Sequence, residues 1–196
     1  MIDYHILEQH VKAKLAGNNN GHGYDHAWRV VKNVRKIAQD IDCNLDICLI
    51  SAYVHDLIDR KVVDDQYLAI SELEGFLTDE LKLSTIDCNH VLEICNTISY
   101  SKNAKLSSVE AKVVQDADRL DALGAIGIAR TIEYSASIKR PVYIAGDRTD
   151  DTAIGHFHTK LYKLIDLMNF EVSKQIAQTK MEIMYQFEQQ FIEENA

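Results

Sequence analysis

The sequence predicts an all-α protein, and two observations on its 196 residues carry this prediction. Hydrophobic residues recur at helical spacing along almost the whole chain. The chain has one proline and eight glycines, too few for the many tight turns of a strand-rich fold. The length and the 46% of hydrophobic residues are ordinary for one globular domain. We therefore expect a single compact bundle of several helices.

The expected helices follow one another closely from the N-terminus. The first ends near Gly17, and the second begins near Asp25, a residue type that caps helix N-termini. The third, at about 46–58, is apolar on most of its faces, which indicates a central position in the bundle. Ser84 and Asp87 resemble a capping box with Asp in place of the usual Glu. Further helices are expected at about 66–82, 84–100 and 108–138.

The C-terminal third begins with the best candidate for a long loop. This segment, 139–151, holds the single proline of the sequence and a run of polar residues. Two closing helices are then expected at about 152–169 and 171–194. The first of them carries a heptad-like apolar stripe, which suits core packing or a helix–helix contact. A homodimer through the closing helices is therefore compatible with the sequence.

Charge and cysteine usage narrow the partners and the compartment. The formal net charge is −9, and an acidic surface of this size repels polyphosphate backbones. We therefore expect no nucleic-acid polymer as a partner. The N-terminus lacks the apolar run of a secretory signal, and no uncharged stretch approaches the length of a membrane span. The four cysteines form no C-x-x-C pair, so we expect reduced thiols. Together with the missing signal and the missing span, this predicts a cytoplasmic protein that is not associated with a membrane.

Two places in the sequence hold acids inside strongly apolar stretches. Asp56 follows His55 near the end of the expected central helix, and Asp116, Asp118 and Asp121 lie together in the expected helix 108–138. A buried carboxylate is costly unless it is paired or coordinates a metal ion, so acids from the two places could share one ion. Imidazole and carboxylate ligands together suit Mn, Fe, Co, Ni or Zn, and carboxylates with water also admit Mg. Taken singly, each residue could instead be a hydrogen-bonded core residue or one member of an ion pair.

The histidines and acids occur in a specific order along the chain. His26 is followed after 29 residues by the pair His55-Asp56, and Asp118 comes after a further 62. This order resembles the H…HD…D signature of the HD superfamily of metal-dependent phosphohydrolases. The surrounding stretches 21–30 and 115–130 are similar to one bacterial branch of that superfamily. Its members are small stand-alone HD proteins that act as nucleotide pyrophosphohydrolases.

The resemblance covers nearly the whole chain, from about residue 20 to residue 194. Its most specific piece is the run Asp-Ala-Asp-Arg-Leu-Asp-Ala-Leu-Gly at 116–124. The resemblance implies one HD-domain phosphohydrolase bundle over residues 1–196. Its core signature would lie at about 22–121 and its C-terminal helices at about 152–194.

The resemblance also implies a metal site and a catalytic acid. The implied ligands of one divalent ion are His26, His55, Asp56 and Asp118. Manganese is expected first, with Mg, Co, Ni, Fe and Zn as alternatives. HD domains with two metals supply extra histidines between the HD pair and the last Asp, but here only His90 lies in that interval. HD nucleotidases carry an acid at the position of Asp59, so we expect Asp59 to orient or deprotonate the attacking water; it could instead be a surface acid.

A phosphate substrate needs cations in addition to the metal. The candidates are charged or imidazole side chains near the signature residues and in the penultimate helix. Each of them could instead be an ordinary salt-bridge residue or a solvated charge. The candidate phosphate-binding residues are His22, Arg29, Lys61, His156 and Lys160.

The expected activity follows from the branch that the sequence resembles. It is the hydrolysis of a (deoxy)nucleoside triphosphate to the monophosphate and pyrophosphate. The alternative within the same class is a nucleoside 5′-monophosphate phosphatase or another hydrolase of small phosphoesters. From another class, a non-catalytic nucleotide-binding HD module would keep the fold and the metal. All four ligand positions are intact in the sequence and we expect no attached partner domain, which favours the enzyme.

Overall fold

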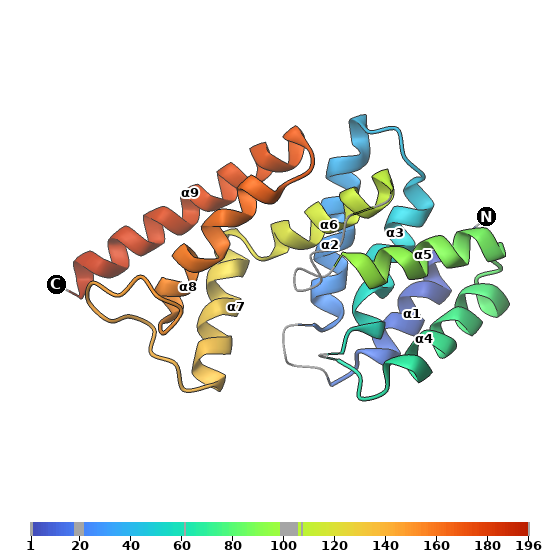
Figure 1. Cartoon of the computed structure of the whole chain (residues 1–196), viewed down its shortest axis with the longest axis horizontal. Helices are drawn as coiled ribbons and strands as arrows, with labels where there is room; N and C mark the ends of the chain where they lie inside the picture. Colours follow the sequence, from blue (N-terminus) through green and yellow to red (C-terminus); the bar gives the residue numbers. More distant parts are fainter. Residues whose placement is uncertain (1, 18–21, 61, 99–105, 107, 196) are drawn as a thin grey trace. The chain divides into compact units, whose positions relative to one another are not determined.

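The computed structural model describes residues 2–17, 22–60, 62–98, 106 and 108–195, and every regular element within these ranges is helical (Figure 1). The all-α prediction is therefore confirmed. The chain divides into two compact units, a first unit at Met1–Asp118 and a second unit at Arg119–Ala196. The candidate metal ligands all belong to the first unit.

The first unit consists of helices joined by short turns. Three of the helices end in a single tighter or wider turn, named η1 (Ala38–Asp40), η2 (His55–Ile58) and η3 (Phe76–Glu80). Helix α6 starts in this unit and its last turn passes the unit boundary. The α-helices are α1 (Tyr4–Lys14), α2 (Tyr24–Ile37), α3 (Leu45–Val54), α4 (Gln66–Gly75), α5 (Thr85–Thr97) and α6 (Val109–Asp121).

Helix α3 forms the centre of the first unit. Every residue from Ile47 to Val54 is buried. The helix packs against α1, α2 and α5, and Figure 1 shows it among them. Burying a large aliphatic side chain stabilises a fold by about 1.5–3 kcal/mol, so α3 contributes strongly to the core. The central position predicted from the apolar faces of this helix is confirmed.

The end of α3 differs from the sequence prediction. The expected helix ran to residue 58, but α-helical geometry stops at Val54 and the chain continues as the tight turn η2. The backbone N–H of Asp59 closes this turn by donating to the carbonyl oxygen of Asp56 at 3.2 Å. Adjacent side chains on a 3₁₀ turn are about 120° apart, compared with about 100° on an α-helix. His55 and Asp56 therefore lie at a helix terminus, where neighbouring side chains can approach one point from two sides.

Two helix starts test the capping predictions. Helix α2 begins at Tyr24 with Gly23 at the N-cap, so the prediction that Asp25 is the cap was wrong. Asp25 lies in the first turn instead, where its charge faces the positive end of the helix dipole. At α5, the Ser84 hydroxyl oxygen accepts from the backbone N–H of Asp87, as predicted. In a capping box, the acid would accept in return from the backbone N–H of the cap residue. Here the Asp87 carboxylate accepts from the Ser84 hydroxyl instead, at 2.8 Å.

The single helix expected at 108–138 is two helices. Helix α6 ends at Asp121, and α7 (Gly124–Ser137) begins after Leu123, whose backbone is extended. Gly124 has a φ of +74°, a conformation that other residues rarely adopt, and a side chain there would meet Lys180 of α9 at 3.3 Å. The break therefore depends on a glycine that apolar periodicity alone does not reveal.

The second unit contains α7, α8 (Ala153–Thr159), the turn segment η5 (Leu161–Leu167) and α9 (Glu171–Glu194). The predicted loop at 139–151 is confirmed, whereas the helix expected at 152–169 is interrupted at Lys160. Most of the apolar stripe in this region is buried, which agrees with core packing; its buried members are Leu161, Leu164 and Met168. In the described part of both units, no helix is long and apolar enough to cross a bilayer.

One buried acid ties three segments of the second unit together. Glu188 of α9 is 6% exposed. Its carboxylate accepts from the Tyr162 hydroxyl at 2.7 Å and contacts His158 Nε2 at 2.7 Å. Arg148, from the loop before α8, donates to the same carboxylate at 2.6 Å. Burial raises the pKa of Glu188, but these polar partners outweigh it and hold the pKa below the ordinary value.

Candidate metal centre

The four residues of the H…HD…D signature come from three elements of the first unit. His26 lies in the first turn of α2, His55 and Asp56 form the start of η2, and Asp118 lies near the end of α6. His26, His55 and Asp56 are buried, and the Asp118 side chain is 32% exposed. Segments that are far apart in the sequence therefore bring two imidazoles and two carboxylates together.

The polar atoms of these four side chains converge closely. His26 Nε2 lies 3.2 Å from His55 Nε2 and 3.3 Å from Asp118 Oδ1. Asp56 presents one carboxylate oxygen to each histidine, with Oδ2 at 3.5 Å from His26 Nε2 and Oδ1 at 3.5 Å from His55 Nε2. His55 Nε2 lies 3.9 Å from Asp118 Oδ1. His26 thus lies between two acids, with Asp56 on one side and His55 and Asp118 on the other, and belongs to both groups of close donors.

These donor distances fit a divalent ion. Ligand atoms at about 2.1 Å from an ion are about 3.0 Å apart at right angles and about 3.4 Å apart at the tetrahedral angle. The contacts from 3.2 to 3.9 Å lie at or slightly above these values. Two overlapping groups of ligand atoms each fall within 4.8 Å: His22, His26 and Asp56, and His26, His55 and Asp118. The cluster could therefore hold a metal ion.

The backbone fixes which nitrogen of His55 faces the cluster. His55 Nδ1 lies 2.9 Å from the carbonyl oxygen of Ala52, one turn earlier. A carbonyl oxygen can only accept, so Nδ1 carries the proton and donates it. In the neutral ring, Nε2 then presents its lone pair to the other side chains of the cluster. Metal-binding histidines commonly have their orientation fixed in this way.

Both acids of the cluster are held ionised. Burial alone raises the pKa of Asp56, but His55, the hydrogen bond with His22 and the nearby His26 outweigh it, and the pKa lies well below the ordinary range. For Asp118, burial and the neighbouring Asp56 raise the pKa, but the hydrogen bond and charge of His26 and the charge of His55 lower it by a larger amount. The net direction for Asp118 is also downward. Deprotonated carboxylates and neutral imidazoles are the forms that bind metal ions.

Sequence reasoning missed a residue that connects two of these elements. Asn33, buried on α2, donates from Nδ2 to the carbonyl oxygen of Ala117 at 3.0 Å. Ala117 immediately precedes Asp118, and Asn33 lies about two helical turns after His26. The only signal in the sequence was a polar amide on the apolar face of an amphipathic helix.

The other predicted residues of the first unit have different environments. His22 precedes α2 and contacts Asp56, with Nδ1 at 3.0 Å from Oδ2. Arg29 is partly buried one turn after His26. Asp59 is partly buried at the C-cap of η2 and is not a member of either group of ligand atoms. Lys61 lies outside the described residues.

The remaining two candidates belong to the second unit. His156 of α8 contacts an acid of the preceding loop, with Nδ1 at 2.5 Å from Asp150 Oδ1. Lys160 is partly buried at the C-cap of α8. The polar partner of His156 is therefore a carboxylate of its own unit. Their predicted role in phosphate binding stays a prediction.

His90, the histidine between the HD pair and Asp118, takes part in a separate contact. Its Nε2 lies 3.0 Å from the Ser108 hydroxyl oxygen and 3.8 Å from a Glu110 carboxylate oxygen. Ser108 also accepts from the backbone N–H of Ala111 and so caps the start of α6. His90 thus supports a helix terminus and is in neither group of ligand atoms found among the described residues.

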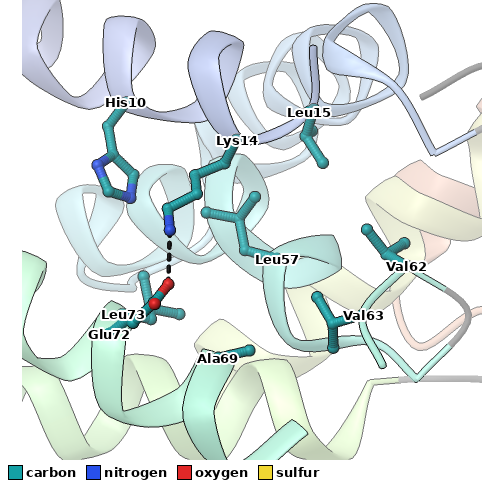
Figure 2. Close-up of a pocket in the computed structure, with 9 residues that line it drawn as sticks. All are labelled: His10, Lys14, Leu15, Leu57, Val62, Val63, Ala69, Glu72 and Leu73. Carbon is teal, nitrogen blue, oxygen red and sulfur yellow. Dashed lines mark hydrogen bonds and ion pairs between the residues drawn. The ribbon is translucent and has the colours of Figure 1, made fainter. Parts of the chain in front are cut away.

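The first unit also contains a small cavity (Figure 2). It holds about 100 Å³, and its apolar lining comes from the residue after α1, from η2 and the segment that follows it, and from α4. Figure 2 shows the ion pair between Lys14 and Glu72 at this cavity, with 2.5 Å between Nζ and Oε2. Binding pockets for drug-sized ligands commonly hold about 300–1,000 Å³, so this cavity is too small for a nucleotide.

Fold and cluster together define an all-α protein with an H…HD…D centre. The HD domain family matches residues 23–123, a segment that includes all four candidate ligands. The chain therefore belongs to the HD domain family.

Individual relatives cover nearly the whole chain. It is 34% identical to the Bacillus subtilis protein YpgQ over 184 residues, which are 92% of this chain and 87% of YpgQ. A crystal structure of YpgQ in complex with ADP superposes with a TM-score of 0.82 at 33% identity and covers 98% of this chain and 97% of that one. An HD-superfamily hydrolase from Bacillus thuringiensis gives a TM-score of 0.81 at 35% identity, covering 97% and 96% of the two chains.

Proposed function

We propose that the protein is a divalent-metal-dependent phosphohydrolase that acts on nucleotides. The first candidate reaction converts a (deoxy)nucleoside triphosphate into the monophosphate and pyrophosphate. The observation that carries the proposal is the convergence of His26 Nε2, His55 Nε2 and the Asp56 and Asp118 carboxylates. We further propose that residues 1–196 work as one HD-domain enzyme.

His26, His55, Asp56 and Asp118 would hold the ion. When bound, a divalent ion polarises a phosphoryl oxygen and lowers the pKa of its water. The bond between His55 Nδ1–H and Ala52 keeps the ring oriented with Nε2 toward the other donors. Two imidazoles with two carboxylates form a mixed donor set that suits manganese and the related divalent ions. Asp59 is the proposed acceptor for the proton of the attacking water.

A nucleotide is the proposed substrate because ADP is bound in the crystal structure of YpgQ, a relative of 33% identity over nearly the whole chain. Phosphate recognition is proposed for Arg29, Lys61, His156 and Lys160. These side chains carry, or can carry, the positive charge that phosphate oxygens attract.

The product of the reaction tests this proposal. Protein freed of metal by a chelator is incubated with Mn²⁺, Mg²⁺, Co²⁺ or Ni²⁺ and a panel of nucleoside tri-, di- and monophosphates. Release of pyrophosphate supports the triphosphate reaction. Release of orthophosphate from monophosphates supports the monophosphatase, and tight binding without turnover supports a binding module. No turnover with any metal or nucleotide would contradict the proposed enzyme.

The ligand assignment has its own test. Asp118→Ala should abolish turnover because it removes a proposed ligand. Asp166→Ala removes the same charge from an exposed position of η5 and should leave activity near that of the wild type. Full activity of the Asp118 variant would refute the assignment.

A further inference from the structure

We infer that His22 is a positioning residue of the metal centre, which holds the Asp56 carboxylate in its ligand orientation. This inference rests on the proposed metal site. It gives His22 a role other than the phosphate binding that the sequence suggested.

The contact between the two side chains is shorter than the contacts that His26 and His55 make with Asp56 and Asp118. His22 Nδ1 lies 3.0 Å from Asp56 Oδ2, whereas the contacts of His26 and His55 with the two acids measure 3.3 to 3.9 Å. The His22 side chain is 22% exposed and the Asp56 side chain 5%. A histidine at the edge of the cluster thus contacts an acid in its interior.

The chemistry of the two groups fixes the direction of the bond. Aspartate has an ordinary pKa of about 3.9, so Asp56 is a carboxylate at neutral pH and can only accept. His22 Nδ1 therefore carries a proton and donates it. A ring nitrogen whose N–H donates to a carboxylate has no lone pair left for an ion. The bond is thus an argument against His22 as a ligand through Nδ1, although its position would allow that role.

The two carboxylate oxygens of Asp56 have different partners. Oδ2 accepts from His22, and Oδ1 lies 3.5 Å from His55 Nε2. A carboxylate turns readily about its terminal bond unless a hydrogen bond fixes its plane. His22 supplies such a bond at Oδ2, which also lies 3.5 Å from His26 Nε2. The carboxylate is thereby held with Oδ1 toward His55 Nε2 and Oδ2 toward His26 Nε2.

A turn before α2, and not the helix itself, places His22. The helix begins at Tyr24 and its N-cap Gly23 is extended, so His22 lies outside the helical register. The carbonyl oxygen of Gly23 accepts from the backbone N–H of His26 at 3.0 Å, which ties the turn to the first helical residues. The rings of His22 and His26 lie edge to face with centroids 6.0 Å apart. One short segment therefore supplies both a proposed ligand and the residue that orients another ligand.

Titration with Mn²⁺ alone, without nucleotide, tests the inference on three variants of the full chain. His22→Ala removes the donor and should weaken Mn²⁺ binding about 10- to 100-fold, the usual effect of losing an outer partner of a ligand. His22→Asn keeps an N–H near the position of Nδ1 and should restore most of the affinity. His5→Ala, an exposed histidine of α1, is the matched control and should bind Mn²⁺ like the wild type. A cooperative denaturant-unfolding transition, measured with a chelator present, checks that each metal-free variant is folded.

Pulsed electron paramagnetic resonance of bound Mn²⁺ separates the alternatives. Two coupled imidazoles in the wild type and in His22→Asn support positioning. Three in the wild type and two in either His22 variant would make His22 a ligand and overturn the inference. Unchanged Mn²⁺ affinity of His22→Ala, with a raised KM for nucleotide, would restore the phosphate role and also overturn it. If the wild type binds no divalent ion at all, the proposed metal site itself fails.

Discussion

The side-chain amide of Asn33 donates to the backbone carbonyl of Ala117 at 3.0 Å, and this bond joins the helix of His26 to the helix of Asp118. Both partners are buried, so water cannot replace either of them. The relative position of the two helices that carry proposed ligands thus depends in part on one buried side-chain amide.

Replacing that amide should weaken both the fold and the site. In Asn33→Ala the Ala117 carbonyl loses its buried donor, which costs about 1–3 kcal/mol of unfolding free energy. The affinity for Mn²⁺ should fall as well, because Asp118 is less firmly placed. Denaturant unfolding and a metal titration measure the two effects. Asn89→Ala, on an exposed position of α5, is the control, and an equal effect of both variants would contradict this account.

The break between α6 and α7 predicts a large difference between two glycine variants. Gly124→Ala forces a side chain into a positive φ of +74° and against Lys180, and should destabilise the protein by about 1–2 kcal/mol. Gly75→Ala lies in α4 where an added Cβ meets no atom within 4 Å, and should stabilise it by about 0.5–1 kcal/mol. Thermal or denaturant unfolding measures both. Equal stability of the two variants would show that the break does not need its glycine.

The acid at the centre of the second unit predicts a pH dependence of stability. The pKa of Glu188 in the folded protein is below its ordinary value of 4.5. As the pH falls through that value, the unfolded chain takes up the proton first, so the stabilisation present above pH 4.5 is lost progressively toward the lower folded pKa.

Glu188→Gln should therefore be less stable than the wild type at pH 7, and the difference should shrink as the pH falls below 4.5. Denaturant midpoints at several pH values give this comparison. Glu182→Gln, an exposed acid of the same helix, should run parallel to the wild type. A constant difference between Glu188→Gln and the wild type across this range would exclude the ionised carboxylate as its source.

The proposed role of Asp59 separates catalysis from metal binding. Asp59→Asn keeps the shape of the side chain and removes its basic carboxylate. We expect kcat to fall by about 10²- to 10⁴-fold, the usual contribution of a general base, while Mn²⁺ affinity changes little. Steady-state kinetics and a metal titration measure the two quantities. Asp64→Asn, exposed in the following loop, is the control, and an unchanged kcat in Asp59→Asn would remove Asp59 from the mechanism.

The parts of the fold that follow from local pattern could be predicted from the sequence. The central position of α3 could be read from its apolar faces, and the bounds 171–194 expected for the last helix agree with α9 at Glu171–Glu194. The order of His26, His55-Asp56 and Asp118 also indicated which side chains lie together. These signals are carried by consecutive residues or by a fixed order along the chain.

The features that could not be predicted depend on contacts between distant residues or on single backbone angles. Asn33 finds its partner 84 residues away, and no spacing rule selects that carbonyl oxygen. The backbone at Gly124 turns left-handed within a run whose apolar spacing continues on both sides. His22 stands four residues before His26, a spacing that would put both on one helical face, yet the helix starts after His22. In each case the tertiary structure outweighs local preference.

The adjacency of His55 and Asp56 in η2 affects how strongly an ion would bind the unfolded chain compared with the folded one. His55 and Asp56 are neighbours in sequence, so this half of the donor set exists in any conformation of the polypeptide. The other half, His26 and Asp118, is separated from it by 29 and 62 residues and reaches it only in the folded first unit. A denatured chain would thus offer a weak two-point chelate, whereas the folded one offers four donors at once. Nearly the whole free energy of ion capture would therefore appear as thermal protection of the native state, which makes a melting curve a sensitive assay of site assembly.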